Sequence, residues 1–357
     1  MANASRRFLG AAAVAAALAG ASPLHAQGRV TFIADALFFG DNTEFRNPFR
    51  EGETIFGTAA VVAAEIPLDE RVTLVAGGFG LQRFGSADGF DLARPVLKLR
   101  LATGRSTFVM GTLDTPLAGE PSGPDRTGPH GLLPPMQRET LAFERPYEAG
   151  LQWKFAGAAL RHDAWINWQR LNTPAHRERF DAGVAGETRV TPWLAIPFQA
   201  HIVHEGGQLY DAGPVADSWA IGSGAIVRHD VRQTSLTMEG HGLLSRYVPD
   251  REVRSAFIEG SGGFARVAAQ RNAWRAHVLS WRARNFVKAE GDPAYQSMTR
   301  GGERYRRTRD YSEAGLTRTF RPAPEAQVET SARLHRTEGH YEYSFRILGV
   351  VHVRRPR

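Results

Sequence analysis

Residues 340–353, HYEYSFRILGVVHV, decide the fold class, because their side chains alternate between two kinds with a period of two. The apolar set stands at the odd positions Tyr341, Tyr343, Phe345, Ile347, Gly349, Val351 and Val353. The polar set includes the even positions Glu342, Ser344, Arg346 and His352. An extended strand places successive side chains on opposite faces, whereas a helix would mix the two sets. The segment therefore predicts a strand with one face in an apolar medium and the other in a polar one.

The same alternation recurs along the chain, clearly so in 94–101, 147–155 and 328–334. Pattern reading gives about sixteen such strands, a count good to about two. They lie near 28–39, 53–65, 71–83, 91–102, 105–113, 147–156, 158–170, 177–187, 192–204, 217–229, 232–245, 254–267, 273–286, 309–320, 326–336 and 340–353. Strands of roughly 10 residues separated by turns and loops are typical of transmembrane β-barrels. We therefore expect an all-β protein, an antiparallel transmembrane β-barrel.

The connections between these strands fall into two classes. If residue 27 starts in the periplasm, every even-numbered strand ends in a short turn. The other connections include long, polar, Gly- and Pro-rich stretches at 40–52, 114–146, 205–216 and 287–308. Short periplasmic turns and long outer loops are the pattern of outer-membrane barrels.

The N-terminus has the features of a secretory signal peptide. Arg6 and Arg7 precede the apolar run 8–18, and small residues follow up to Ala26. A charged start, a short apolar segment and a small residue at the cut are what such a signal requires. We expect cleavage of 1–26 and a single domain over 27–357. The Sec route is expected, since a twin-arginine signal would have one more residue between the arginines and Phe8.

Composition narrows the classes of function. The chain has no cysteine, which excludes thiol catalysis and thiolate metal sites. The longest stretch without Asp, Glu, Lys or Arg beyond residue 26 is 190–204, too short for a helical span and interrupted by two prolines. The mature chain keeps 42 basic and 37 acidic residues, a net charge of +5 spread along its length. We therefore expect outer-membrane lipid, and not nucleic acid, as a partner.

On these patterns the chain resembles a Gram-negative outer-membrane porin across 28–353. The resemblance implies an outer-membrane channel for passive diffusion of small hydrophilic solutes. It also implies that the third outer loop, 114–146, folds into the lumen and narrows it. Its charged residues are the candidates for the constriction: Asp125, Arg126, His130, Arg138 and Glu139. The chain departs from many such barrels at its end, where a basic tail replaces a terminal aromatic residue.

Charged residues on the polar faces are the candidates to line the pore: Arg94, Lys98, Arg100, Lys154, Arg161, Asp163, Arg275, Glu329 and Arg333. Arginine accounts for 41 of the 44 basic residues, and guanidinium groups bind carboxylates and phosphates. An arginine-lined constriction would favour anionic solutes. Two alternatives stay open: a ladder of opposite charges that only stabilises the wall, and a GC-rich genome as the source of the arginines. The sequence leaves homo-oligomer formation open.

Other functions remain as alternatives to the channel. A barrel plugged by 114–146 could serve as a surface anchor or scaffold, and a soluble periplasmic β-protein is a third interpretation. Enzyme activity is not expected, because no G-x-S-x-G is present. In addition, the polar residues of pairs such as His201 and His204, or Glu239 and His241, stand too far apart along one strand for hydrogen bonding. We expect no catalytic residue, metal or cofactor.

Overall fold

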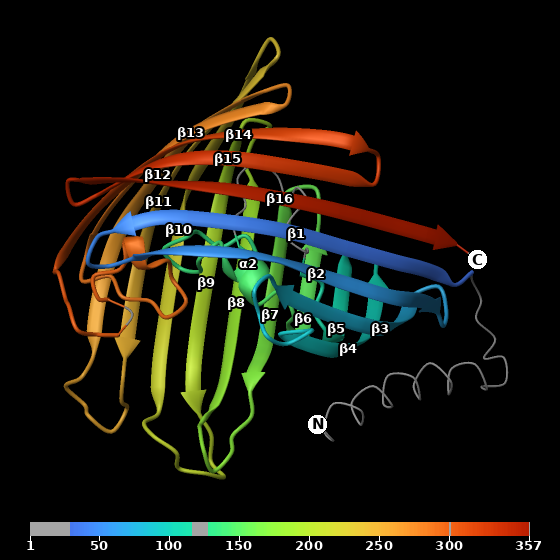
Figure 1. Ribbon diagram of the computed structural model, residues 1–357, viewed down its shortest axis with the longest axis horizontal. Helices are drawn as coiled ribbons and strands as arrows, with labels where there is room; N and C mark the ends of the chain where they lie inside the picture. Colours follow the sequence, from blue (N-terminus) through green and yellow to red (C-terminus); the bar gives the residue numbers. More distant parts are fainter. Residues whose placement is uncertain (1–28, 116–127, 300, 357) are drawn as a thin grey trace.

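The chain forms one closed antiparallel barrel. The computed structural model describes residues 29–115, 128–299 and 301–356, so the expected signal peptide, Asp125 and Arg126 lie outside the described residues. Sixteen strands follow one another around the barrel in sequence order. Strands of the near wall cross those of the far wall, and the short helix α2 lies between the two walls (Figure 1). The predicted fold class is confirmed.

The strands and the two short helical turns have the following bounds: β1 (Thr31–Arg46), β2 (Glu51–Pro67), β3 (Val72–Arg83), β4 (Leu92–Thr103), β5 (Ser106–Thr112), α2 (Leu141–Glu144), β6 (Ala149–Ala156), β7 (Leu160–Arg170), β8 (Glu178–Arg189), β9 (Leu194–Gly206), β10 (Ala216–Val231), β11 (Thr234–Val248), β12 (Ile258–Arg271), β13 (Trp274–Arg284), η1 (Pro293–Tyr295), β14 (Thr308–Ala323), β15 (Ala326–Thr337) and β16 (His340–Pro356).

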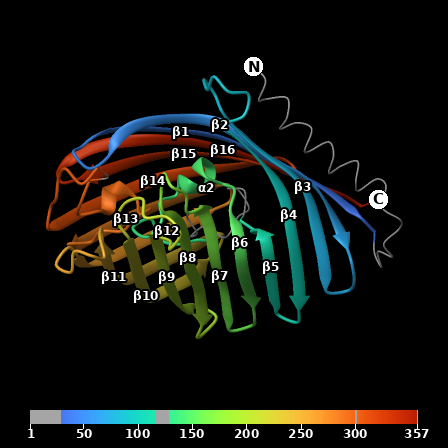
Figure 2. The same ribbon diagram turned by 90° about the horizontal axis from the view of Figure 1, so that it is seen from below.

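The barrel closes where the two ends of the chain meet. β1 pairs with β16 from Thr31 opposite Pro356 to Glu44 opposite Tyr343, and it pairs with β2 on its other side. Every strand therefore has two hydrogen-bonded neighbours, and the main chain presents no sheet edge to the lipid. Figure 2 shows the same closed wall from a second direction.

Alternation sorts the side chains between lipid and lumen, as the sequence predicts. On β16, Tyr341, Tyr343 and Phe345 are exposed on the outer face, whereas Glu342 and Ser344 are buried on the inner face. The other strands expose large apolar side chains in the same way, for example Leu97, Leu151, Ile221, Val278 and Leu334. A soluble protein rarely exposes so much apolar surface, which suits a lipid environment instead.

The expected outer loop 40–52 is much shorter than predicted, because β1 continues to Arg46 and β2 begins at Glu51. The polar side chains at this end of β1 form hydrogen bonds with the neighbouring strands, so the strand continues through residues expected to form a loop. Asp41 pairs with Arg346 of β16, and Asn42 accepts a hydrogen bond from Thr54 of β2. The short and long connections otherwise alternate as expected, except for the two-residue turn between β15 and β16.

Two long connections fill the lumen. The described part of the β5–β6 connection, including α2, buries Leu132, Leu133 and Met136 against the inner wall, and its role as a constriction stays a prediction. The β13–β14 connection, expected outside, also enters and buries Phe286 and Tyr295 in the same cluster. No helix among the described residues is long and apolar enough to span a membrane.

Candidate active site

Hydrogen bonds hold the two lumen segments together. Asp292 N–H donates to the Pro134 oxygen at 2.9 Å, and Arg138 N–H donates to the Glu290 oxygen at 2.8 Å. Trp281, on the wall, donates its indole N–H to the Tyr295 oxygen at 3.0 Å. The segments therefore form one packed body at the long-loop end of the barrel, and they enclose the polar side chains of β14, β15 and β16 beneath it.

A serine, a histidine and a glutamate lie in contact on these three strands. Ser344 Oγ lies 2.8 Å from His335 Nε2. His335 Nδ1 lies 3.4 Å from Glu313 Oε2 and 2.8 Å from the Tyr311 hydroxyl. All four side chains are buried on the inner wall. Nucleophile, base and orienting group in a chain of hydrogen bonds is the arrangement of an acyl-transfer site.

The network fixes the state of the imidazole. The Tyr311 hydroxyl donates its one proton to Glu313 Oε2 at 2.6 Å, so it accepts from His335 Nδ1–H. In the tautomer protonated at Nδ1, Nε2 of His335 carries the lone pair that accepts the Ser344 hydroxyl proton. Glu313 is held on its other oxygen by His277 Nε2 at 2.8 Å. This is the tautomer that a general base for Ser344 needs.

Two arginines lie beside the serine and share one carboxylate. Arg333, opposite Ser344 in the strand register, and Arg346 both donate to Glu139 Oε2, at 2.8 and 2.7 Å. Burial alone would raise the pKa of Glu139, but the two guanidinium groups outweigh burial and lower that pKa to about 2. Glu139 belongs to the β5–β6 connection and not to a strand. The two arginines of the wall therefore bind a carboxylate that a lumen segment supplies.

A small cavity separates these groups. It is lined by Ser344, His335, Glu313, Arg333 and Glu139, and its volume is about 20 Å³. A space of roughly 10–15 Å³ suffices for one water molecule. The cavity therefore has room for about one water molecule.

His130 lies in a second polar cluster, on the β5–β6 connection. Its ring stacks on Trp165 with centroids 3.7 Å apart. Nε2 lies 2.7 Å from Glu148, and Nδ1 lies 3.0 Å from Asp163. Burial by itself lowers the pKa of His130, but the two carboxylates outweigh burial and raise that pKa to about 9. His130 is therefore a charged anchor between the connection and the wall.

Asp181, His201 and Glu290 form a group whose ligand atoms lie within 4.8 Å of one another, as a metal site requires. Glu290 Oε1 already accepts from Arg145 at 2.6 Å and Arg179 at 3.2 Å. These cations balance the carboxylates and tie the β13–β14 connection to the wall. The group serves as an anchor, and the absence of a metal stays a prediction.

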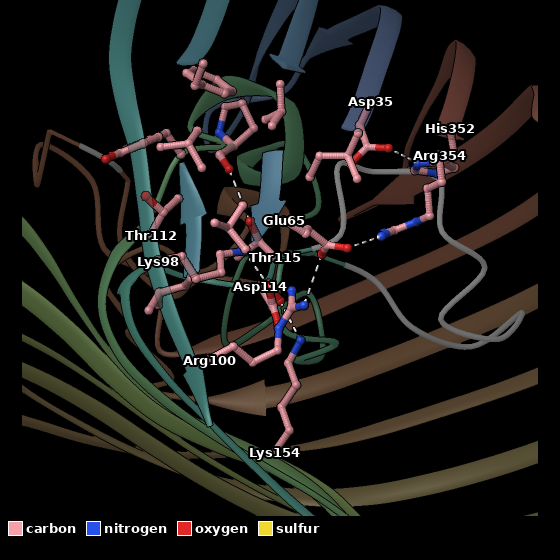
Figure 3. A pocket seen from close by; sticks show the side chains of 18 residues that line it. Asp35, Glu65, Lys98, Arg100, Thr112, Asp114, Thr115, Lys154, His352 and Arg354 are labelled. Atoms are coloured by element: carbon pink, nitrogen blue, oxygen red, sulfur yellow. Dashed lines mark hydrogen bonds and ion pairs between the residues drawn. The ribbon is translucent and has the colours of Figure 1, made fainter. Parts of the chain in front are cut away.

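A larger cavity of about 270 Å³ lies toward the opposite end of the lumen, since its lining residues Glu65 and Arg354 stand near the short-turn ends of β2 and β16. Figure 3 shows the side chains that line it. Lys98 and Arg100 of β4 and Lys154 of β6 converge there on Asp114. The structure thus brings three of the predicted pore-lining residues together, while a fourth, Arg333, lies at the serine site with the predicted constriction residue Glu139.

The remaining predicted residues are dispersed over the inner wall and the lumen segment. Asp163 pairs with His130, Arg161 with Glu187, Arg275 lies near Glu329, Arg138 contacts Glu144, and Arg94 is exposed without joining either cavity. Their role in a solute path stays a prediction.

Comparison with known proteins gives the family. The model of the lipid A 3'-O-deacylase-type family matches residues 22–351. The chain belongs to this family. No curated protein matches the sequence significantly.

Solved outer-membrane barrels share the fold of this lipid A 3'-O-deacylase-type protein. A loop L8 deletion mutant of OmpT from Vibrio cholerae aligns with a TM-score of 0.58 at 12% identity, over 91% of this chain and 99% of that one. OccK8 (OprE) from Pseudomonas aeruginosa aligns with a TM-score of 0.54 at 9% identity, over 91% and 98%. The comparison confirms the expected β-barrel fold, and identities this low carry the fold alone.

The prediction that the chain is not an enzyme is wrong, because its family is named for a deacylase. Pairs along one strand do not include Ser344, His335 and Glu313, which belong to three strands. The expectation that Glu239 and His241 stand too far apart is also wrong, since Glu239 Oε2 lies 3.0 Å from His241 Nε2. Adjacent strands lie only about 4.8 Å apart, so residues distant in sequence meet across the sheet. The two-residue turn Glu338–Gly339, with φ of 54° and 91°, sets the register that makes His335 and Ser344 diagonal neighbours. That Glu-Gly turn is the signal that could have revealed the pair.

Proposed function

We propose that this barrel hydrolyses an acyl ester of a lipid A-type glycolipid in the outer membrane, with Ser344 as the nucleophile. The observation that carries the proposal is the contact of 2.8 Å between Ser344 Oγ and His335 Nε2. The family match supports the same class of reaction, since its description names the removal of an acyl chain from lipid A.

The groups divide the reaction as follows. His335 Nε2 takes the hydroxyl proton while Ser344 Oγ attacks the ester carbonyl, and Glu313 stabilises the imidazolium that forms. The tetrahedral intermediate collapses, His335 returns the proton to the leaving alcohol, and the acyl group remains on Ser344. A water molecule then repeats the sequence, releases the fatty acid and restores the serine.

Arg333 and Arg346 supply positive charge beside the reacting atoms. Preorganised donors aimed at a developing oxyanion are commonly the largest contribution to such catalysis. In the closed site both arginines bind Glu139 Oε2. An anionic group of the substrate, or the oxyanion itself, would take the place of that carboxylate oxygen.

The test is deacylation of purified lipid A by the folded protein in detergent, followed by mass spectrometry. The wild type should release one acyl chain, and Ser344→Ala and His335→Asn should each lower the rate by at least a hundredfold. Ser331→Ala, a serine on the inner face of β15 beside this site, should keep wild-type activity. A Ser344→Ala protein that deacylates at the wild-type rate, or a folded wild type that releases nothing, would refute the proposal.

A channel is the second candidate, favoured by the cationic cavity of about 270 Å³ at the short-turn end. It would pass small hydrophilic solutes with a preference for anions. Single-channel steps in a planar bilayer would support it, and neutralising Arg94 and Arg100 should then lower the anion-over-cation permeability. Folded protein without conductance steps would exclude the channel and would not bear on the proposed ester hydrolysis.

A further inference from the structure

The cavity at the short-turn end has two unlike walls. One wall is apolar, with Val75, Phe79 and Val96 buried and Tyr147 packed on Phe79 at 5.5 Å between ring centroids. The other is charged, as Figure 3 shows: Lys98, Arg100, Lys154 and Arg354 line it together with Asp35, Glu65 and Asp114. Four cationic side chains against three carboxylates leave an excess of positive charge.

Three of these four cations surround Asp114, a residue of the chain itself, whereas Arg354 pairs with Glu65. Lys98 Nζ and Arg100 Nη2 both bind Asp114 Oδ1, Arg100 at 3.1 Å. Lys154 Nζ donates to the main-chain oxygen of Asp114 at 2.7 Å. Burial would raise the pKa of Asp114, but Lys98, Arg100 and Lys154 outweigh burial and hold that pKa well below its usual range.

Lys154 is the cation of this group that lacks a direct ion pair with a carboxylate. Among the described residues it makes no ion pair within 4 Å, whereas Lys98 pairs with Asp114 and Arg100 pairs with both Asp114 and Glu65. Lys154 is half-buried, and a half-buried ammonium whose one direct contact is a neutral oxygen gains from an added anion.

We propose that this cavity is a binding site for a small carboxylate with an apolar, ring-sized body. The carboxylate would bind Lys154 and Arg100 beside or in place of the Asp114 side chain, and the body would pack on Phe79, Val96 and Tyr147. The volume of about 270 Å³ is below the roughly 300–1,000 Å³ of pockets for drug-sized ligands, so one aromatic ring fits. The proposal does not rest on the hydrolase, because Ser344 lies near the opposite end of β16 from Arg354.

The unmodified folded barrel in detergent gives the first test, by calorimetric titration with benzoate, its neutral isostere benzamide, acetate and inorganic phosphate. Benzoate should bind saturably and at least tenfold more tightly than each of the other three. Benzamide binding as well as benzoate would overturn the charge requirement, acetate binding as well would overturn the apolar wall, and phosphate binding more tightly would overturn the carboxylate class. No saturable binding of benzoate to the wild type would also overturn the proposal.

Variants test the assigned groups. Lys154→Met should weaken benzoate binding at least tenfold, whereas Arg161→Gln, which removes an inner-wall cation paired with Glu187 outside the cavity, should leave it unchanged. Asp114→Asn should tighten benzoate binding, because it removes the internal competitor; weaker binding by this variant would contradict that role. Ser344→Ala should bind benzoate like the wild type, so this proposal and the hydrolase can fail separately.

Discussion

His130 makes the attachment of the β5–β6 connection depend on pH. Its pKa is raised to about 9 by Glu148 and Asp163, which outweigh burial, against a reference of about 6.5. A raised pKa stabilises the docked state fully below pH 6.5 and loses that contribution as pH rises through about 9. The difference amounts to about 3 kcal/mol, on the order of a hundredfold in the opening equilibrium.

Hydrogen exchange of the segment 128–148 measures this opening directly. Protection factors, corrected for the intrinsic pH dependence of exchange, should fall on the order of a hundredfold between pH 6 and pH 9, since most of the linkage energy lies in that window. The protection factors of amides in the barrel wall, for example in β12, should not change over the same pH range. The loss is then local to the connection and is not general unfolding of the barrel.

Two variants separate His130 from other titrating groups. His130→Asn should lower the protection at pH 6 and remove most of its pH dependence. His162→Gln is the matched control, because His162 precedes Asp163 on β7 but lies on the opposite face of the strand, where it packs on Trp153 and Phe155. Protection that does not change with pH in the wild type, or a His130→Asn protein with the wild-type pH profile, would refute the linkage.

Three further predictions concern stability. Trp281→Ala should cost about 3–5 kcal/mol, because Trp281 is fully buried and donates to the Tyr295 oxygen; urea unfolding followed by the heat-modifiable gel shift measures it, and a cost below 1 kcal/mol would contradict the packing. Leu97→Arg on the lipid face should cost about 2–4 kcal/mol in the same assay in lipid vesicles, and an unchanged midpoint would argue against lipid contact there. Glu290→Gln should cost about 3 kcal/mol, because Arg145 loses its ion pair and Arg179 keeps only its ion pair with Glu205; faster tryptic cleavage within 285–307 measures it, and wild-type cleavage rates would refute the anchor.

The sequence predicts the wall of the barrel well and its contents poorly. Alternation is a local property of each strand, so the strand count and the outward face of β16 follow from residues 340–353 and their equivalents. The sequence of the β13–β14 connection predicts a polar outer loop, because charged residues are many and apolar residues few. The few apolar residues Phe286, Val287 and Tyr295 are nevertheless buried and hold the connection inside the lumen.

The serine site is hidden for a different reason. Its members belong to three strands, and their contacts depend on register, which is set by turns and not by the strands themselves. A shift of one residue between β15 and β16 would turn Ser344 toward the lipid. Alternation places both arginines on polar faces, Arg346 within 340–353 and Arg333 among the pore-lining candidates. It does not predict that they share the carboxylate of Glu139, which is expected in the lumen for a different role.

The packing of the lumen also decides how a substrate can reach Ser344. Withdrawing the β5–β6 connection would expose Leu132, Leu133, Met136 and Phe143, all almost fully buried. At about 1.5–3 kcal/mol for each side chain, this would cost roughly 6–12 kcal/mol, an upper estimate that still exceeds what one ion pair returns. Displacing only Glu139 from Arg333 and Arg346 exchanges one buried anion for another and leaves the apolar anchors in place. Entry of an anionic ester is therefore a local exchange at Glu139, and Glu139→Gln should lower the KM for lipid A, because the neutral amide competes less strongly for the two arginines. An unchanged KM with a lowered kcat would instead assign Glu139 to the chemical step.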